Sequence, residues 1–592
     1  MRTIILLGIF TMNIYSLSAQ KLVPTDFLFR SMAVVNTDST INNMRSNVIT
    51  EIILKEDLQT NSTLVWLGTG LGVSVIINSD TVEAVPDTSG LANSLSSSST
   101  KTTTNRLPQG GISAMAAGND GTLFIAFAGS ENDIPVGQGF ALTSNASAFN
   151  ATDSTINWTY FNQQIENNDK PYFEFWQFKS EALPITVPHQ NVTYDIALSH
   201  IDEDTSYAFT ANWAGGLRRL KFKNEYNSNG DIIGLTPIKW ERVPIPMDNQ
   251  FTLNTCELTS YDTVPDPYDP PNEMLILKDY YFNPRDPIDG GNHNHKVFSI
   301  LTYGDTIWVG TANGINRGIF GGYSQIFGYC INWEHYSYPE YNLSGNFVVG
   351  LALQTHKGKR VIWAATVNAD DPTEQRGVSY TTNDGLSWNT ALLGERVYNI
   401  TAQDSLVFAA TANGLWMTED GINWARYKPA QQHSPYSTDE VLANEVYSVA
   451  FDTGDTSIWI GTGDGVAHSY DLDGLDWKIF RAEYDVDEDY AYPNPFSPYT
   501  HNVLGGDGYV RFHTNEWSGS SEIKLDVYNF AMEKVFAGSF DRTATSSGAL
   551  KWNGRDMEGR LVNNGVYFIK LTYAEGYNIK PSPHWVKLIV VK

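Results

Sequence analysis

One short phrase recurs along most of this 592-residue chain. It consists of an apolar run with Trp or Phe, then Gly-Thr or Ala-Thr, then Gly and another apolar residue. Four copies are clear and three are weaker. Self-similarity of this kind indicates a fold of repeated units that bury their apolar faces against one another. The clear copies begin at Val65, Ile307, Val407 and Ile458, and the weaker ones at Leu123, Ala208 and Val361.

Each phrase predicts a buried strand followed by a tight hairpin. A continuous apolar run bounded by turn residues is typical of a strand that is covered on both faces. Asn313-Gly314 supplies the positive φ angles that tight hairpin turns require. The small residue after the aromatic one, such as Gly310, suits a crowded site where strands converge. A further apolar strand precedes each phrase, so each unit contains four strands.

Four-stranded units in radial order predict an all-β chain, a β-propeller of about seven blades. The composition agrees, because aromatic residues reach 13% and the chain holds 48 Gly and 25 Pro. The phrases are spaced more widely than the usual 40–50 residues of a blade, so insertions are expected. They are expected either to carry the binding function or only to cover the rim of the disc. These insertions are residues 84–109, 131–190 and 223–296.

The N-terminus has the order of a secretory signal: Arg2, an apolar run over residues 4–10, and the small residue Ala19 before a cleavage site. We therefore expect a signal peptide over residues 1–19, an exported protein and a propeller over residues 20–485. An N-terminal membrane anchor is the alternative. No later stretch approaches the roughly 20 apolar residues that span a bilayer.

The net charge limits which binding partners the protein can have. A net charge of −27 argues against a nucleic-acid surface, which needs a basic face.

The chain has two cysteines. Cys256 and Cys330 form a candidate disulfide in an oxidising compartment, with two free thiols as the alternative. No cofactor is expected. Ca²⁺ stays open because of acidic runs such as residues 485–489, which do not complete an EF-hand loop.

Three turn phrases follow the strand phrases in the last part of the propeller. They resemble the Asp-box of sialidase-like and sortilin-like propellers, and the strand phrases resemble the propellers of two-component sensors. The resemblance implies that the Asp accepts backbone N–H groups, the Gly is left-handed and the Trp packs between strands. The box is structural in those families. The residues are Asp384, Gly385 and Trp388; Asp420, Gly421 and Trp424; and Asp473, Gly474 and Trp477.

Beyond an acidic linker (residues 486–492), alternating strands predict a small β-sandwich over residues 493–592. Its motifs resemble the FlgD-type Ig-like domain and the C-terminal sorting domains of the type IX secretion system. The resemblance implies an address that is read by the secretion machinery, and an adhesion or spacer module is the alternative. The motif residues are Tyr492, Pro493, Asn494, Pro495, Phe496, Trp552, Gly554, Asp556, Gly559, Gly565, Val566 and Tyr567.

These features together predict an exported binding module at the cell surface, on the outer membrane, or in the extracellular space. Its ligand is expected to be a glycan or a protein, held at the channel mouth or on the aromatic insertions. A sialidase- or glucanase-like glycoside hydrolase and an extracellular sensor are the alternatives. We name no catalytic residue, because any pair among 66 acidic residues fits a glycosidase and the sialidase Phe/Tyr-Arg-Ile-Pro motif is missing. His293 and His295 are read as polar surface rather than as metal ligands.

Overall fold

The computed structural model describes residues 30–31 and most of residues 44–592. The expected signal peptide, Cys256, Asp473, Gly474, Trp477 and Pro493 lie outside the described residues. The segments left out are 1–29, 32–43, 58–61, 80, 86, 89–101, 105, 109, 119–120, 132–133, 150–155, 167–171, 176–177, 182–184, 203, 230–231, 256–260, 266–272, 278–279, 325–327, 370, 428–438, 441–444, 455, 464, 470–471, 473–477, 481–489, 493, 500–507, 514–521, 542–549 and 574–582.

Seven antiparallel sheets follow one another in the described part of the propeller, and we call them blades A to G. Each blade is built from consecutive strands. Blades B and D each gain a fifth, outer strand from an insertion. The strands of blades A to C are β2 (Ile49–Asp57), β3 (Ser62–Thr69), β4 (Gly72–Ile77) and β5 (Thr81–Ala84); β9 (Gly111–Ala117), β10 (Leu123–Glu131), β11 (Ile134–Thr143), β12 (Trp158–Phe161) and β7 (Thr102–Thr104); and β15 (Thr193–His200), β16 (Thr205–Asn212), β17 (Gly216–Tyr226) and β18 (Ile232–Arg242).

The remaining four blades repeat the same plan. The strands of blades D and E are β22 (Val297–Tyr303), β23 (Thr306–Thr311), β24 (Gly314–Ser324), β25 (Gly328–Tyr336) and β19 (Thr252–Asn254); and β26 (Phe347–His356), β27 (Lys359–Val367), β28 (Gly377–Thr381) and β29 (Asn389–Ala391). Those of blades F and G are β30 (Val397–Gln403), β31 (Leu406–Thr411), β32 (Gly414–Thr418) and β33 (Ala425–Tyr427); and β35 (Val446–Asp452), β36 (Ser457–Thr462), β37 (Gly465–Ser469) and β38 (Lys478–Phe480).

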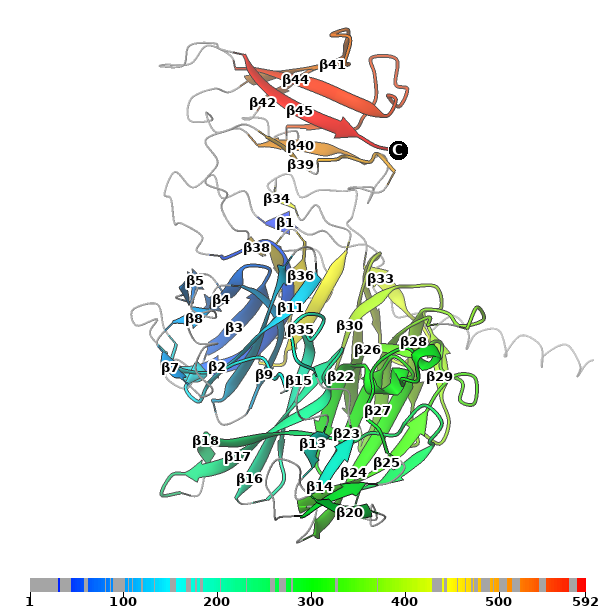
Figure 1. Ribbon diagram of the computed structural model, residues 1–592. Helices are drawn as coiled ribbons and strands as arrows, with labels where there is room; N and C mark the ends of the chain where they lie inside the picture. Colours follow the sequence, from blue (N-terminus) through cyan, green and yellow to red (C-terminus); the bar gives the residue numbers. More distant parts are fainter. Residues whose placement is uncertain are drawn as a thin grey trace, which may run out of the picture.

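The first strands of the blades form a closed ring, in which each packs against the next and β35 of blade G returns to β2 of blade A (Figure 1). All seven recurring phrases lie on the second strands, β3, β10, β16, β23, β27, β31 and β36. The apolar runs on these strands are almost fully buried, as their composition predicts. The predicted all-β propeller is confirmed.

Neighbouring blades meet at the small residues of the phrases. A Cβ atom on Gly310 of blade D would lie 2.6 Å from Val348 Cγ1 of blade E, so only glycine fits there. Gly461 of blade G meets Ile49 of blade A in the same way. Hydroxyl groups add bridges between neighbouring blades: Ser299 of blade D donates to the Val348 carbonyl of blade E at 3.0 Å, and Thr50 of blade A donates to the Ile112 carbonyl of blade B at 2.8 Å.

The turn phrases of blades E and F lie between the third and fourth strands. In blade F, Asp420 accepts from the backbone N–H groups of Ile422 and Asn423 at 2.9 and 2.7 Å. Trp424 lies edge-on to Trp363 of blade E with ring centroids 5.8 Å apart. The turn therefore fastens each blade to the preceding one.

Blade E differs in one residue from the expectation. Here Asn383 takes the acceptor position, because its Oδ1 receives the N–H of Ser387 at 3.0 Å. Asp384, which the resemblance assigned to that role, instead adopts a φ of 55° and faces Arg360 at 3.6 Å. Gly385 is left-handed with a φ of 95°, and Trp388 packs edge-on to Trp308 of blade D at 6.0 Å. The turn has one more residue than that of blade F, so the acceptor shifts by one position.

The insertions form short additional elements. Strands from two separate insertions pair into one sheet, in the order β13-β14-β21-β20. Cys330 is disulfide-bonded, and the only other cysteine of the chain, Cys256, lies outside the described residues. These elements are β13 (Tyr172–Phe175), β14 (Phe178–Glu181), β20 (Tyr261–Pro265) and β21 (Glu273–Leu277), the two-stranded pairs β1 (Arg30–Ser31) with β34 (Asp439–Glu440) and β6 (Asp87–Thr88) with β8 (Leu107–Pro108), and the 3₁₀ turns Ala146–Ala148, Pro287–Asp289 and His293–His295.

The C-terminal unit is a two-sheet β-sandwich with its own core. Its first strand starts at Tyr490, so the sandwich begins inside the segment that the sequence assigned to the linker. The core holds Phe496, Trp552 and Tyr567 from the predicted motifs. One sheet contains β39 (Tyr490–Tyr492), β40 (Val510–His513) and β43 (Lys551–Trp552), and the other contains β42 (Lys534–Asp541), β41 (Glu522–Tyr528), β44 (Gly565–Tyr573) and β45 (His584–Val590).

The remaining motif residues that the structure describes lie in turns or in strands of the sandwich. Asn494 exchanges hydrogen bonds with β45, accepting from Ile589 N–H at 2.9 Å and donating to the Lys587 carbonyl at 2.8 Å. Asp556 accepts the N–H groups of Glu558 and Arg560, both at 2.9 Å. Gly554 and Gly559 have φ angles of 74° and 79°, and Gly565 and Val566 begin β44. Across the described residues, no helix is long and apolar enough to cross a membrane.

Candidate functional site

The first strand of every blade carries a β-bulge one or two residues after it starts. The bulged residues lie beside the hairpin that joins the second and third strands, at one end of the ring of first strands, which we call the mouth. Bulges commonly re-aim side chains next to functional sites. The residue is small in blades A and B, aliphatic in blade E and aromatic in the other four. In blade order the bulged residues are Thr50, Ser113, Tyr194, Phe298, Val349, Tyr398 and Tyr447.

Four aromatic side chains from blades C, D and E form a continuous group, which we call the mouth cluster: Tyr194, Trp213, Phe298 and Phe347. Phe298 is its centre, with ring centroids 5.5 Å from Tyr194, 5.3 Å from Trp213 and 5.8 Å from Phe347. The ammonium of Lys296 lies 5.0 Å from the Trp213 ring centroid. Tyr194 is 43% exposed, and the other three rings are half-buried. Rings held in place and still open to water suit stacking on a ligand.

A second aromatic pair lies on blades F and G. The Tyr398 and Tyr447 rings are 5.3 Å apart and both hydroxyls donate to Glu445, at 3.1 and 2.8 Å. Burial and the neighbouring Glu445 raise the pKa of both phenols, so they remain donors at neutral pH. The guanidinium of Arg396 lies 5.1 Å from the Tyr398 ring centroid. This side of the mouth therefore combines aromatic surface with both signs of charge.

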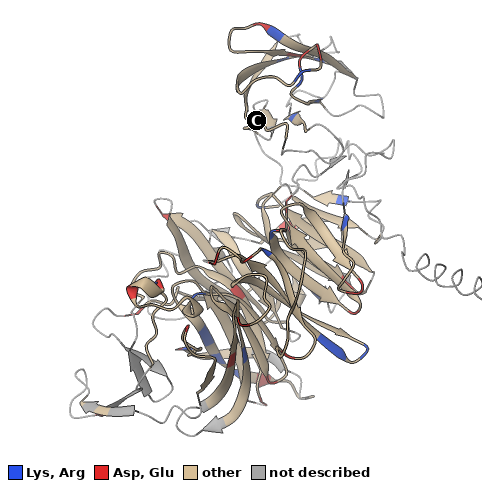
Figure 2. Cartoon of the chain, turned by 90° about the vertical axis from the view of Figure 1, so that its right-hand side faces the viewer, with Lys and Arg blue, Asp and Glu red and all other residues tan. Residues whose placement is uncertain are grey.

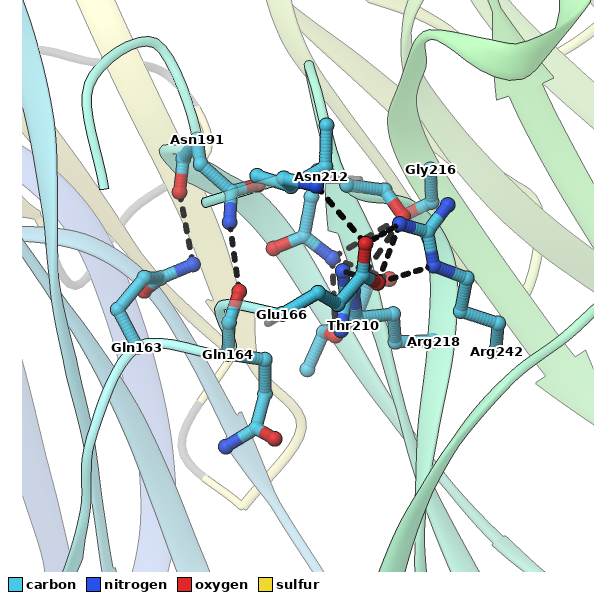
Figure 3. Close-up of polar contacts among 11 residues, drawn as sticks. Gln163, Gln164, Glu166, Asn191, Thr210, Asn212, Gly216, Arg218 and Arg242 are labelled. Carbon is cyan, nitrogen blue, oxygen red and sulfur yellow. Dashed lines mark hydrogen bonds and ion pairs between the residues drawn. The ribbon is translucent and has the colours of Figure 1, made fainter. Parts of the chain in front are cut away.

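A buried charge cluster, formed by Glu166, Arg218 and Arg242, supports the blade C side of the mouth (Figure 3). Arg218 Nη2 lies 2.9 Å from Glu166 Oε1, and Arg242 holds both carboxylate oxygens. Burial opposes ionisation of Glu166, but Arg242 and Arg218 outweigh it and hold its pKa below the usual value. Burial and Arg242 lower the pKa of Arg218 to about 10. Glu166 comes from the insertion after blade B, so the cluster fastens that insertion to blade C.

The same cluster fixes the turn that carries Trp213. Arg218 Nε donates to the Gly215 carbonyl at 3.3 Å. Asn212 donates to the Gly216 carbonyl at 3.1 Å and accepts from Thr193 at 2.7 Å. Figure 3 shows the side chains of Asn212 and Arg218 approaching this turn. The position of the Trp213 ring is therefore set by buried hydrogen bonds.

Two carboxyl groups from non-adjacent blades lie near each other, and the charge of one acts on the other. Glu51 lies on β2 and Asp195 on β15, and blade B stands between these strands in the ring. Burial and the neighbouring Asp195 raise the pKa of Glu51 to about 8, and burial raises that of Asp195 to about 7. Asp195 accepts from Ile300 N–H at 2.7 Å and from Ile196 N–H at 2.8 Å. One of its oxygens therefore joins blade C to blade D, and the other binds the N–H of the next residue on β15.

This pair predicts a pH-dependent stability. Folded Glu51 keeps its proton between its ordinary pKa of 4.5 and about 8, whereas the unfolded chain releases it, so stability falls as pH rises through that window. Glu51→Gln removes the share of this dependence that comes from Glu51, whereas the share from Asp195 remains. We expect the variant to unfold like the wild type below the window and to be more stable above it, by up to about 5 kcal/mol, in urea unfolding across pH. Glu340→Gln, at an exposed loop position, is the control. Parallel pH profiles for Glu51→Gln and the wild type would contradict the prediction.

The sequence indicated the channel mouth and the insertions but named no residue of the mouth. A signal is visible in retrospect: four first strands begin with a β-branched residue, then an aromatic one, then Ser, Asn or Asp, as in Val297-Phe298-Ser299.

Of the pair His293 and His295, His295 is buried and stacks on Phe282, with ring centroids 4.9 Å apart. Burial lowers the pKa of His295 to about 4. Within the described residues, no three His, Cys, Asp or Glu side chains gather into a metal-binding group.

Comparison with known proteins gives distant structural matches only. No protein-family model and no curated protein matches the chain. PorZ, a surface component of the type IX secretion system of Porphyromonas gingivalis, is 16% identical with a TM-score of 0.29; the match covers 89% of this chain and 64% of that one. The β-propeller domain of Cps50 from Myceliophteria thermophila is 11% identical with a TM-score of 0.34; the match covers 71% of this chain and 96% of that one.

A third match is the extracellular domain of a hybrid two-component system from B. thetaiotaomicron. It is 11% identical with a TM-score of 0.19, and the match covers 92% of this chain and 74% of that one. The chain thus spans 64% of the length of the PorZ chain. Similarity at this level supports no conclusion about function, which must come from the residues themselves.

Proposed function

We propose that this chain is an exported binding protein that holds a glycan or peptide at the channel mouth of its propeller. The observation that carries the proposal is the mouth cluster, in which four aromatic rings from three blades meet and remain partly open to water. Such rings offer stacking surface to sugars and apolar surface to peptides. The buried charge cluster beneath Trp213 holds this surface in place before a ligand arrives, which lowers the entropic cost of binding.

The proposal extends to seven blades in the propeller and to a sorting role for the sandwich. The support for the sorting role is the set of motifs between Tyr492 and Tyr567, which resembles type IX sorting domains. Those motif residues whose side chains are described lie in the core or in turns of the sandwich. The N-terminal segment fits the same route, because it has the order of a secretory signal.

Expression in a bacterium with a type IX secretion system tests both parts. A chain truncated after residue 489 is expected to stay inside the cell, as measured by protease accessibility on intact cells. Tyr194→Ala/Phe298→Ala is expected to reach the surface in normal amounts. It should bind at least about tenfold less of whichever labelled oligosaccharide or peptide of a panel binds the wild type. The control is Leu386→Ala/Ile422→Ala, which changes exposed apolar residues at the opposite ends of the blades.

The two parts fail separately. Surface delivery of the truncated chain would refute the sorting role and leave the binding site untouched. Equal ligand binding by the mouth variant and the control variant would refute the mouth as the binding site. The panel also decides the class of ligand, since oligosaccharides and peptides are tested side by side.

A further inference from the structure

The outer face of the larger sandwich sheet carries aromatic and basic side chains instead of the small polar residues that an exposed sheet usually presents. Ile523, Leu525 and Val527 of β41 point into the core, so Lys524, Asp526 and Tyr528 face outward. Phe568 and Lys570 on β44, and Trp585 and Lys587 on β45, face outward for the same reason. We call this surface the outer sheet face.

The strand register places these side chains in rows. One row runs Lys534, Tyr528, Phe568, Lys587, and the next contains Asp526, Lys570 and Trp585. The Tyr528 and Trp585 rings are 5.6 Å apart. Lys534 forms an ion pair with Asp526 at 3.0 Å, which leaves Lys524, Lys570 and Lys587 as the excess positive charge of the face. Lysines therefore stand between the rings over the whole face.

Apolar side chains project at the edge of the same surface. The turn between β41 and β42 exposes Phe530 and Met532, which are 76% and 53% exposed. Ile589 of the last strand and Val591 just after it are also exposed. Aliphatic side chains gain by leaving water for an acyl layer, whereas a glycan would use the rings alone.

The charge of the sandwich sets it apart from the rest of the chain. Residues 490–592 contain 11 basic residues (Lys and Arg) and 9 acidic ones (Asp and Glu). The remainder of the chain contains 28 basic and 57 acidic residues. Figure 2 marks these charges on both units. A basic surface on an otherwise acidic protein would attract an anionic partner, whereas the propeller would repel the same partner.

We propose that the outer sheet face binds an anionic lipid surface. Phe530 and Met532 would enter the interfacial layer, Trp585 and Tyr528 would lie at headgroup level, and Lys524, Lys570 and Lys587 would contact the lipid phosphates. This contact is separate from ligand binding at the channel mouth and from delivery to the cell surface. It would keep the exported chain beside a membrane and leave the propeller in solution.

Sedimentation of the purified full chain with vesicles tests the proposal. The chain is expected to sediment with phosphatidylcholine–phosphatidylglycerol vesicles and to stay in the supernatant with phosphatidylcholine alone, and added salt should release it. Lys524→Glu/Lys570→Glu/Lys587→Glu should weaken binding at least about tenfold. Phe530→Ser/Met532→Ser should also weaken it. All five side chains are outside the core, so both variants should unfold at the wild-type denaturant concentration.

The matched control reverses three exposed lysines of the propeller, Lys223→Glu/Lys357→Glu/Lys359→Glu, and changes the net charge by the same amount. It should bind vesicles like the wild type. Equal loss in the control would show that only the total charge matters and would overturn the proposal. Sedimentation with neither vesicle would overturn it as well and would favour an acidic protein as the partner of this face.

Discussion

Gly310→Val is expected to destabilise the propeller by about 3 kcal/mol or more, measured as a shift in the urea midpoint of unfolding. Gly310 belongs to the phrase of blade D and lies against the first strand of blade E. A Cβ atom there would be 2.6 Å from Val348 Cγ1 and 2.7 Å from the Val348 carbonyl oxygen. One of these atoms is backbone, so the new side chain fits only if the two blades separate.

Gly350→Ala is the matched control. Gly350 lies on the neighbouring first strand, where a Cβ atom would be 3.5 Å from Ala365 Cβ, an ordinary van der Waals distance. The free energy of unfolding of the Gly350→Ala variant should differ from that of the wild type by less than about 0.5 kcal/mol. If Gly310→Val unfolded at the same urea concentration as this control, the blades would not be packed as closely as the structure shows.

Much of the propeller could be predicted from the sequence because its repeats have strong local signals. The phrase around Trp308 encodes a buried strand, a tight turn and a crowded contact at once, and the structure shows all three. Of the three box Trp residues, the two that the structure describes, Trp388 and Trp424, pack against the preceding blade. The acceptor in blade E could not, because the longer turn moves that role from Asp384 to Asn383, and composition does not reveal turn length.

The candidate site was less predictable because it depends on contacts between distant segments. Tyr194 and Phe347 are more than 150 positions apart in the chain, and each looks like an ordinary strand residue by itself. Glu166 lies in an insertion with no repeat, yet it meets Arg218 and Arg242 of another blade. Hydrophobic periodicity contains no information about such pairs.

Glu166→Gln should destabilise the folded chain by about 3–5 kcal/mol, because it leaves two buried guanidinium groups without a counter-charge. The Arg218 and Arg242 side chains are 7% and 3% exposed, so water cannot replace the carboxylate. The pKa of Glu166 is lowered in the folded state, so its contribution is present above its ordinary pKa of 4.5 and is lost as pH falls. The difference in the free energy of unfolding between wild type and variant, measured with urea, should therefore become smaller at acidic pH.

Two further variants separate charge from packing. Glu334→Gln breaks an exposed pair with Arg317 and should cost less than about 1 kcal/mol. Glu166→Gln/Arg218→Met/Arg242→Met leaves no charge in this cluster, so it should recover most of the stability that the single variant loses. Methionine also keeps an apolar contact with Phe282, over which the Arg242 guanidinium lies at 4.1 Å. If the triple variant were less stable than Glu166→Gln, the three side chains would contribute specific hydrogen bonds to the Trp213 turn beyond charge balance.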